Sequence, residues 1–304
     1  MFQQAVLGLA AVTFVFSVGA ILYVKITGTE TFVSIKDQRE KKLKQNGGSS
    51  QIALSKTEFR NFKLIEKYQI SSNTYRLIFQ LADKNQILGL GLGQCVSVKM
   101  NINGKEIMRS YTPVSKLNEL GQFELVVKVY PTGVMTPALK DLQVGQNVSV
   151  RGPKGNFVYK PEKFKQFIML AGGSGITPMY QVIQELLANN ADTTKITLVY
   201  ANVGFDDILL KSELDNLAKQ HSDRFVLHYV LEKPSGDWVS EGGSVGYITK
   251  DIILNNLDNS LIPQTQALLC GPLPMIKAME GHLESIGFQP ADLISKPDHQ
   301  IYKF

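Results

Sequence analysis

Ile168-Met-Leu-Ala-Gly-Gly-Ser-Gly-Ile-Thr-Pro178 is the stretch that decides the fold. It begins with an apolar run and passes into a glycine turn, and Pro178 suits the first position of a helix. Apolar residues then follow at helical spacing, at Met179, Val182, Ile183, Leu186 and Leu187. The sequence therefore predicts a strand, a tight turn and a helix. Because glycine has no side chain in the way, such a turn lets backbone N–H groups approach a phosphate closely.

The turn by itself leaves two interpretations open. Its Gly-x-Gly-x-x-Pro arrangement lacks the third small residue of the ordinary dinucleotide fingerprint. Ala201-Asn202 also stands where that fingerprint has an acidic residue. A nucleotide-binding turn and a turn that serves only tight packing are therefore both consistent with this stretch alone.

The composition is that of a globular protein with sizeable cores, since 44% of the 304 residues are hydrophobic. This length is enough for two ordinary domains and an extra segment. Cys95 and Cys270 are too few and too far apart for a disulfide framework, which indicates a reducing compartment. The four histidines show no metal-ligand spacing, so the sequence predicts no zinc, haem or iron–sulfur site.

Residues 5–24 form an uncharged apolar run of the length that crosses a hydrocarbon core as a helix. We therefore predict a transmembrane anchor at residues 1–25. A cleaved signal peptide fits less well, because the first basic residue, Lys25, comes after the run. A buried core helix is a third interpretation of this run.

Residues 26–57 are predicted to form a basic, flexible tether. Six basic residues face three acidic ones between Lys25 and Lys44, and residues 46–50 are Asn-Gly-Gly-Ser-Ser. The positive-inside rule then places everything after the anchor on the cytosolic side of a single-pass membrane protein. Anionic lipid headgroups account for the basic charge without nucleic acid. The long apolar run favours the endoplasmic reticulum over the mitochondrial outer membrane.

Residues 58–304 divide into two predicted domains by their hydrophobic period. Short runs of period two, separated by glycine and asparagine turns, occupy residues 58–163 and predict a small closed β-barrel of six antiparallel strands with Greek-key connections. Strand-type and helix-type runs alternate over residues 164–304, which predicts an α/β domain with a mainly parallel sheet. In that domain we expect strands at Lys195–Tyr200, Phe225–Val230 and Gln266–Cys270, and a helix at Ile208–Gln220.

Three motifs in this order resemble the ferredoxin-NADP reductase superfamily. They are Arg109-Ser-Tyr-Thr-Pro-Val-Ser115, similar to its flavin motif, the glycine turn at residues 171–178, and Cys270-Gly-Pro-Leu-Pro-Met275, similar to its second nucleotide motif. Within the superfamily, residues 60–304 are most similar to the NADH-cytochrome b5 reductase family. This resemblance implies an enzyme with the cofactors FAD and NADH, in which NADH reduces the flavin by hydride transfer and the flavin then passes single electrons to cytochrome b5.

The resemblance also implies the FAD site residue by residue. Arg109 would hold the diphosphate, Tyr111 would pack on the flavin ring, and Thr112 would hydrogen-bond near the flavin N5. The other implied FAD contacts are Ser110, Val126, Lys128, Tyr130, Gly133, Met135, Thr136 and Thr177. Two positions depart from the family, which usually has Lys where this chain has Val134 and His where it has Cys95. Cysteine does not replace imidazole as a proton relay, so we interpret Cys95 as a packing residue.

The implied NADH contacts are Lys128, Gly173, Gly175, Pro178, Glu232, Cys270, Gly271, Pro272 and Phe304. The catalytic residues that the resemblance implies are Thr112, Thr177 and Cys270, although Cys270 can also be read as an ordinary buried cysteine. A carboxylate at Glu232 accepts hydrogen bonds from a ribose 2′-hydroxyl and repels a 2′-phosphate, which favours NADH over NADPH. The neighbouring Lys233 weakens this argument. Phe304 would cover the nucleotide, or would be a frayed terminus.

Cytochrome b5, which is acidic in the family, is the implied protein partner of a monomeric enzyme, and the bilayer is the partner of the N-terminal helix. Exposed lysines are plausible docking charges for cytochrome b5: Lys99, Lys105, Lys116, Lys154, Lys163 and Lys165. Two other classes of function stay open. One is a related flavoenzyme whose acceptor is a quinone or another haem protein, and the other is a membrane-tethered binding module without turnover.

Overall fold

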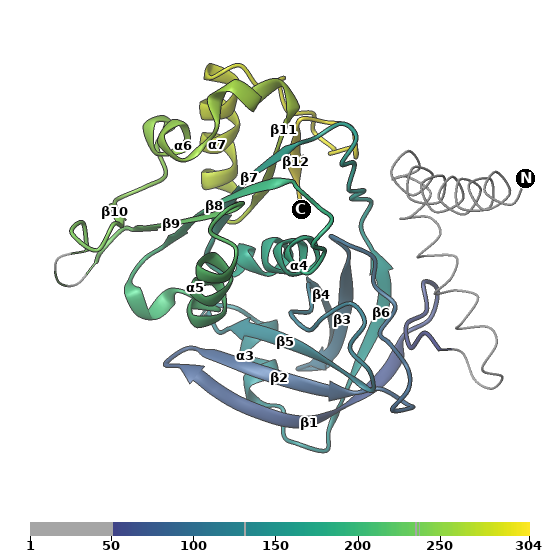
Figure 1. Cartoon of the computed structure of the whole chain (residues 1–304). Coiled ribbons are helices and arrows are strands. Elements are labelled where there is room, and N and C mark those ends of the chain that lie inside the picture. The colour runs from purple at the N-terminus through teal and green to yellow at the C-terminus, as the bar shows by residue number, and fades with distance from the viewer. Residues whose placement is uncertain (1–50, 131, 235, 237) are drawn as a thin grey trace, which may run out of the picture. The chain divides into compact units, whose positions relative to one another are not determined.

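The structure is a computed structural model, and it describes residues 51–130, 132–234, 236 and 238–304. The predicted anchor and most of the predicted tether lie outside these residues. Within the described part of the chain, no helix is long and apolar enough to cross a membrane. Residues Ile52–Phe304 form one compact unit that contains two sheets (Figure 1).

The first sheet has six antiparallel strands in the order β4-β3-β6-β1-β2-β5, as predicted. Strand β6 lies between β3 and β1, which are distant from it in sequence, and this is a Greek-key arrangement. A short helix, α3 (Met135–Asp141), connects β5 to β6. The strands are β1 (Arg60–Ser71), β2 (Thr74–Gln80), β3 (Cys95–Ile102), β4 (Lys105–Tyr111), β5 (Gln122–Lys128) and β6 (Asn147–Lys154).

The predicted barrel is closed by loop contacts, since its end strands β4 and β5 are not paired with each other among the described strands. Just beyond β4, the Val114 N–H donates to the Glu124 carbonyl of β5 at 2.9 Å. The Glu124 N–H in turn donates to the Ser115 Oγ at 3.1 Å. The buried core inside the sheet includes stacked Phe79 and Phe123, whose ring centroids are 5.2 Å apart. The segment just after β4 thus bonds to β5 at Glu124 and bridges the two end strands.

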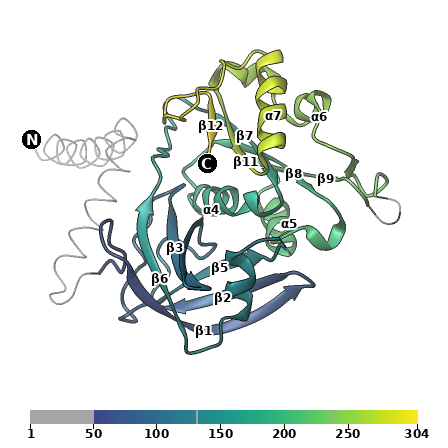
Figure 2. The same cartoon turned by 180° about the vertical axis from the view of Figure 1, so that it is seen from behind.

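The second sheet is entirely parallel, with the order β10-β9-β8-β7-β11-β12. Helices α4 and α5 pack on the face turned toward the first sheet, and α6 and α7 pack on the opposite face (Figures 1 and 2). The strands are β7 (Gln166–Gly172), β8 (Lys195–Asn202), β9 (Phe225–Leu231), β10 (Ser244–Val245), β11 (Thr265–Cys270) and β12 (Ile301–Lys303). The helices are α4 (Ile176–Leu187), α5 (Lys211–Gln220), α6 (Lys250–Asn256) and α7 (Leu273–Ser285).

Two predicted helix starts are wrong. Helix α4 begins at Ile176, so Pro178 is the third residue of its first turn. The predicted helix at Ile208–Gln220 begins only at Lys211, because Leu210 has a left-handed φ of 57° that an α-helix excludes. Residues 208–210 are buried in the core, so their apolar side chains resemble the start of a helix face in sequence.

Candidate functional site

The carboxyl ends of β7 and β11 form the centre of the candidate site. These strands pair in parallel, with Ala171 opposite Cys270. The chain visits β8, β9 and β10 on one side of β7 and then crosses to β11 on its other side. Ligands of open α/β sheets bind at such a reversal of strand order. The predicted glycine turn and the predicted Cys270-Gly271-Pro272 segment therefore meet where a nucleotide is expected.

The glycines of the turn allow the two strand ends to approach each other. A Cβ atom on Gly175 would lie 2.2 Å from the Cys270 carbonyl oxygen, and one on Gly172 would lie 2.5 Å from the Met275 Sδ. Tight packing, one of the two interpretations of the turn, is thus correct for these two glycines. Gly173 differs, because it has a left-handed φ of 53° and its Cβ would approach only the Tyr130 hydroxyl, at 3.6 Å. Gly173 is therefore the glycine that leaves open space for a ligand.

Helix α4 fastens the turn to the antiparallel sheet. The Gln181 side chain accepts from the Gly93 N–H at 2.8 Å and donates to the Gln94 carbonyl at 3.2 Å. One helical turn later, Gln184 donates to the Val114 carbonyl at 3.0 Å. The two sheets are therefore joined by directed bonds beside the turn. These bonds fix the position of the turn relative to β4 and β5.

The flavin motif lies on the end strand β4. Arg109 is exposed and donates to the Met108 carbonyl at 2.8 Å, and it has no carboxylate partner among the described residues. Tyr111 is on the same face, half-buried against the barrel core. Burial raises the pKa of Tyr111 to about 12, although the charge of Arg109 opposes this. The Tyr111 side chain is therefore a neutral phenol at physiological pH, close to a guanidinium that has no carboxylate partner among the described residues.

The other end strand, β5, carries Val126 and Lys128. Val126 is buried in the cluster that α4 forms with the parallel sheet. The Lys128 Nζ forms an ion pair with the Asp207 Oδ1 at 2.6 Å, across the boundary between the two sheets. Beyond β5, the Tyr130 hydroxyl lies 3.4 Å from the Ser174 Oγ of the glycine turn. A predicted FAD residue, Tyr130, is thus in direct contact with the predicted nucleotide turn.

The remaining predicted residues differ in what their side chains can reach. Met135 is buried in the barrel core, so any contact with FAD falls to its backbone. The hydroxyl of Thr136 accepts from the Tyr130 N–H at 3.3 Å, and that of Thr177 donates to the Ser174 carbonyl at 3.3 Å. Both threonines therefore support the turns on which other candidates lie. The roles of these residues toward a cofactor stay predictions.

The predicted nucleotide residues at the sheet edge are spread over three strand ends. Glu232 follows β9 and is half-buried, and its N–H donates to the Asn202 carbonyl at 3.0 Å. Phe304 follows β12, and its N–H donates to the Leu269 carbonyl at 3.0 Å. The ring of Phe304 packs 5.5 Å from that of Phe157. Phe304 is thus held beside β11 and not frayed.

Comparison with known proteins places this arrangement in a family. Residues 61–159 match the family of oxidoreductase FAD-binding domains, and residues 169–281 match that of oxidoreductase NAD-binding domains. NADH-cytochrome b5 reductase 1 of Candida albicans is 45% identical to the chain over 251 residues, which cover 83% of this chain and 84% of that protein. The chain belongs to the NADH-cytochrome b5 reductase family.

Other members of the NADH-cytochrome b5 reductase family match the chain over a similar or greater length. NADH-cytochrome b5 reductase 1 of Cryptococcus neoformans is 39% identical over 292 residues, 94% of each protein. Among solved structures, the cytochrome b5 reductase domain of Ulva prolifera nitrate reductase is 35% identical, with a TM-score of 0.75. That match covers 83% of this chain and 100% of the domain. The architecture of two sheets is therefore that of the family.

The cofactors of this NADH-cytochrome b5 reductase family member are FAD and NADH. The donor set of the site fits both. Arg109 offers a planar guanidinium that has no carboxylate partner among the described residues, as a diphosphate needs, next to the ring of Tyr111. Gly173 offers close backbone approach at a helix start, which suits a nucleotide.

We expect the Lys128–Asp207 pair to stabilise the contact between the two sheets. Burial alone would raise the pKa of the Asp207 carboxyl, but the hydrogen bond and charge of Lys128 outweigh it and hold that pKa below its usual value. In a cycle of Lys128→Met, Asp207→Asn and the double variant, thermal unfolding should give a coupling of about 1–2 kcal/mol. Because the pKa is lowered, this stabilisation is present above about pH 4 and is lost as the pH falls further.

The control for this cycle is the exposed pair Lys99–Glu106, whose atoms are 2.7 Å apart. Solvent screens that pair, so its coupling should stay below about 0.5 kcal/mol. Equal coupling energies in the two cycles would show that Lys128–Asp207 acts as an ordinary surface pair.

Cys270 is a neutral thiol in this family member. Burial, and in second place the neighbouring Cys95, raise the pKa of Cys270 to about 11. The thiolate is the nucleophilic form of cysteine, so Cys270 is neither a nucleophile nor a base at neutral pH. Its predicted catalytic contribution is therefore that of a small side chain that leaves room for the nicotinamide ring.

This state of Cys270 predicts slow alkylation. In a Cys95→Ser background at pH 7.5, iodoacetamide should modify Cys270 about 100-fold more slowly than a free cysteine, with a rate that rises toward pH 11. Peptide mass spectrometry measures the rate at each pH. Modification at the rate of a free cysteine at pH 7.5 would contradict a buried neutral thiol.

Tyr200 is a supporting residue that the sequence did not reveal. It is fully buried, its hydroxyl donates to the Gly173 carbonyl at 2.9 Å, and it accepts from the Leu209 N–H at 3.2 Å. Tyr200 thus fixes the one glycine of the turn that faces open space. Its position at the end of a predicted strand was the only available signal, and it does not distinguish Tyr200 from a core residue.

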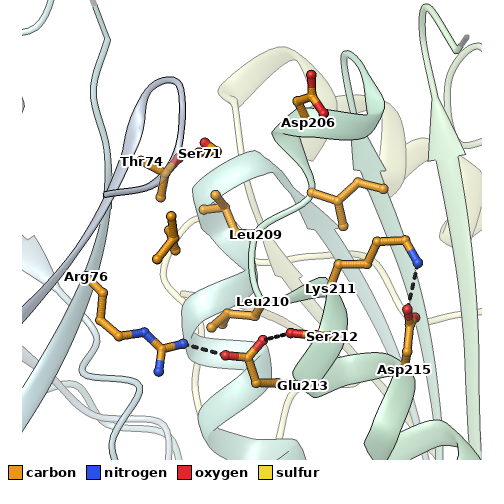
Figure 3. Close-up of a pocket in the computed structure, with 12 residues that line it drawn as sticks. Ser71, Thr74, Arg76, Asp206, Leu209, Leu210, Lys211, Ser212, Glu213 and Asp215 are labelled. Atoms are coloured by element: carbon orange, nitrogen blue, oxygen red, sulfur yellow. Dashed lines mark hydrogen bonds and ion pairs between the residues drawn. The ribbon is translucent and has the colours of Figure 1, made fainter. Parts of the chain in front are cut away.

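A pocket of about 390 Å³ lies between the β1–β2 hairpin and the start of α5 (Figure 3). Arg76 of β2 forms an ion pair there with Glu213 of α5, and a second one with Glu124 at 3.4 Å. None of the predicted cofactor residues lines this pocket. It is therefore part of the contact between the two sheets and separate from the candidate cofactor site.

The six lysines predicted to dock cytochrome b5 have different surroundings. Lys99 is paired with Glu106, so its charge is already offset. Lys154 lies beside the predicted FAD residue Ser110, with its Nζ 3.4 Å from the Ser110 Oγ. Within the described residues, five of the six form no salt bridge: Lys105, Lys116, Lys154, Lys163 and Lys165. The role of all six in docking stays a prediction.

Proposed function

We propose that this chain is an FAD-dependent NADH-cytochrome b5 reductase, which passes a hydride from NADH to FAD and single electrons from the flavin to cytochrome b5. The observation that carries the proposal is the contact between the two predicted cofactor sites. Tyr130, beyond the FAD strand β5, touches Ser174 in the nucleotide turn at 3.4 Å. A nicotinamide held by the turn and a flavin held by β4 and β5 would then lie side by side.

The protein contributes binding and orientation. Bound FAD supplies a ring that accepts a hydride at N5 and releases electrons one at a time. Arg109 binds the diphosphate, and Tyr111 packs on the ring as a neutral phenol. Thr112 donates a hydrogen bond near N5. Gln181 and Tyr200 hold the nucleotide turn in place, so that the two reacting atoms meet without rearrangement of the fold.

Spectra of the purified full chain test the proposal. Purified protein should be yellow, NADH should bleach the flavin band, and cytochrome b5 should then be reduced. The same preparation is compared with a quinone and with ferricyanide as electron acceptors. Reduction of the quinone at a much higher kcat/KM than that of cytochrome b5 would replace the proposed acceptor. A colourless protein that binds no FAD would overturn the enzyme assignment.

We expect Glu232 to determine the choice between NADH and NADPH. Glu232→Ala removes a half-buried carboxylate at the end of β9, where the family places the adenosine ribose. The ratio of kcat/KM for NADPH to that for NADH should rise about 10-fold or more, because repulsion of the 2′-phosphate is lost together with a hydrogen bond to the 2′-hydroxyl. The control is Lys233→Ala, which removes a positive charge and should therefore not raise the use of NADPH. An unchanged ratio in Glu232→Ala would contradict the role of Glu232.

We also propose that the enzyme is a monomer anchored by residues 1–25 in the endoplasmic reticulum membrane, with its catalytic part in the cytosol. The uncharged run at residues 5–24 and the basic flank after it support this location. Alkaline extraction of membranes should leave the full chain in the pellet and release a variant that lacks residues 1–25. Release of the full chain would contradict the anchor. Sedimentation of the truncated variant as a dimer would contradict the monomer.

A further inference from the structure

Asn202 is a buried polar residue that the proposed mechanism does not yet use. It is the last residue of β8, and only 8% of its surface is exposed. Neither amide atom, Nδ2 or Oδ1, has a hydrogen-bond partner among the described residues. The Asn202 side chain lies close enough to the Tyr200 hydroxyl to oppose the rise in the pKa of Tyr200 that burial causes. That hydroxyl, however, already donates to Gly173 and accepts from Leu209. Buried amides are nearly always hydrogen-bonded, because an unpaired one costs free energy. The Asn202 amide therefore needs a partner that the described chain does not supply.

The strand register places this amide inside the nucleotide edge of the sheet. Strand β8 lies between β7, which ends in the glycine turn, and β9, which ends in Glu232. Side chains alternate along a strand, so Asn202 shares the face of Tyr200, the face on which α4 packs. The Asn202 amide is therefore positioned between the predicted nicotinamide turn and the predicted ribose carboxylate.

The chemistry of the amide selects among the groups of a nucleotide. Asn202 presents one unpaired donor group and one unpaired acceptor, and both need a partner. Phosphate oxygens only accept, so a diphosphate would leave Oδ1 unpaired. Ribose hydroxyls both donate and accept. The nicotinamide carboxamide also donates and accepts. Its predicted place, however, is between β7 and β11, and β11 and β8 lie on opposite sides of β7.

We propose that Asn202 binds a ribose of NADH, with its Nδ2 donating to one hydroxyl and its Oδ1 accepting from another. This inference rests on the proposed function, because it takes NADH as the ligand at this edge of the sheet. It adds a recognition residue at the position where the ordinary dinucleotide fingerprint has an acid. An amide there binds the ribose without adding negative charge beside the diphosphate.

The affinities of the full-length holoenzyme for NAD⁺ and for ADP-ribose test the proposal. ADP-ribose keeps both riboses and lacks the nicotinamide. In Asn202→Leu, both dissociation constants should rise by the same factor, about 10-fold or more. Asn202→Ala serves as a second variant in case the leucine side chain perturbs packing, and the same rise is expected there. The FAD content and the flavin spectrum should match the wild type. The KM for NADH should rise with the dissociation constants.

A merely structural role of Asn202 gives a different result in thermal unfolding. If the amide is paired only when nucleotide is bound, Asn202→Leu removes an unpaired buried group from the nucleotide-free protein. The midpoint of its thermal unfolding without nucleotide should therefore stay equal or rise. The stabilisation that saturating ADP-ribose gives to the wild type should shrink. The control is Thr197→Val in the same strand, whose buried hydroxyl donates to the Asn256 carbonyl at 2.9 Å. Thr197→Val should lower the midpoint and leave ADP-ribose affinity unchanged.

Three results would overturn the inference. Unchanged affinity of both Asn202 variants for both ligands would remove Asn202 from the site. Weaker binding of NAD⁺ alone would mean that the partner is the carboxamide and not a ribose. A lower midpoint with unchanged affinities would show a structural amide. Failure of the proposed function is separately visible, because the wild type itself would then bind neither NAD⁺ nor ADP-ribose.

Discussion

Gly175→Ala should lower kcat/KM for NADH by about 100-fold or more, because a Cβ at this position cannot fit without moving one of the two strand ends that form the site. It would lie 2.2 Å from the Cys270 carbonyl oxygen and 2.9 Å from the Gly271 nitrogen. Both are backbone atoms, so no flexible side chain can give way. A shift of about 1 Å in either loop would misplace the nicotinamide relative to the flavin.

The same substitution should also reduce stability, by the roughly 1–3 kcal/mol that overpacking costs. Gly281→Ala is the matched control, since its Cβ would meet nothing within 4 Å and the residue lies inside α7. Gly281→Ala should retain full activity and gain up to about 1 kcal/mol from higher helix propensity. Stopped-flow reduction of the flavin by NADH and thermal unfolding measure the two effects. Wild-type reduction kinetics in Gly175→Ala would contradict the proposed position of the nucleotide.

Arg109→Leu should weaken FAD binding by about 100-fold or more, because two charge-assisted hydrogen bonds to the diphosphate are lost. The fold should persist, since the Arg109 side chain is exposed and bonds only to the adjacent Met108 carbonyl among the described residues. The variant should therefore purify largely colourless and become yellow again when FAD is added in excess. Arg109→Lys should bind FAD with intermediate affinity, since a lysine keeps the charge but loses the planar pair of donors.

Arg151→Leu controls for the change in net charge. Arg151 lies on β6, which β3 separates from the strand of the flavin motif, and it packs on the Phe59 ring at 4.7 Å. This variant should retain FAD through purification. Flavin content per chain and titration of the apoprotein with FAD measure both variants. A fully yellow Arg109→Leu would contradict the role of Arg109, and equal loss in both variants would indicate a general effect of charge.

The order of the elements could be predicted because each depends on neighbours in the sequence. The period-two runs became the six strands of the antiparallel sheet, and the Asn103-Gly104 turn between β3 and β4 has the two positive φ values that such a hairpin requires. The buried run at Ile168–Leu170 became β7, paired on both sides. The predicted start of α5 was wrong because Leu209 and Leu210 are buried in a loop, and their apolar side chains give the same sequence pattern as a helix face.

The candidate site was predictable only where a motif lies within one stretch of chain. Arg109 and Tyr111 are two residues apart on β4, so their common face follows from the sequence. Asp207 and Lys128 are 79 residues apart, and Tyr200 reaches Gly173 from another strand. Pairs of this kind depend on how β7 and β8 pair and how the two sheets meet. No local pattern encodes them.

The sequence by itself determined the strand, the glycine turn and the helix at residues 168–187. It also determined the kind of ligand that the backbone of such a turn can bind. Local backbone geometry and hydrophobic period are sufficient for that much. Only the tertiary structure decided which glycine does what: Gly172 and Gly175 pack against β11 and α7, whereas Gly173, held by Tyr200, faces Tyr130. The physical reason is that a Cβ clash is a property of the neighbouring strand, and the chain reaches β11 about 90 residues after the turn.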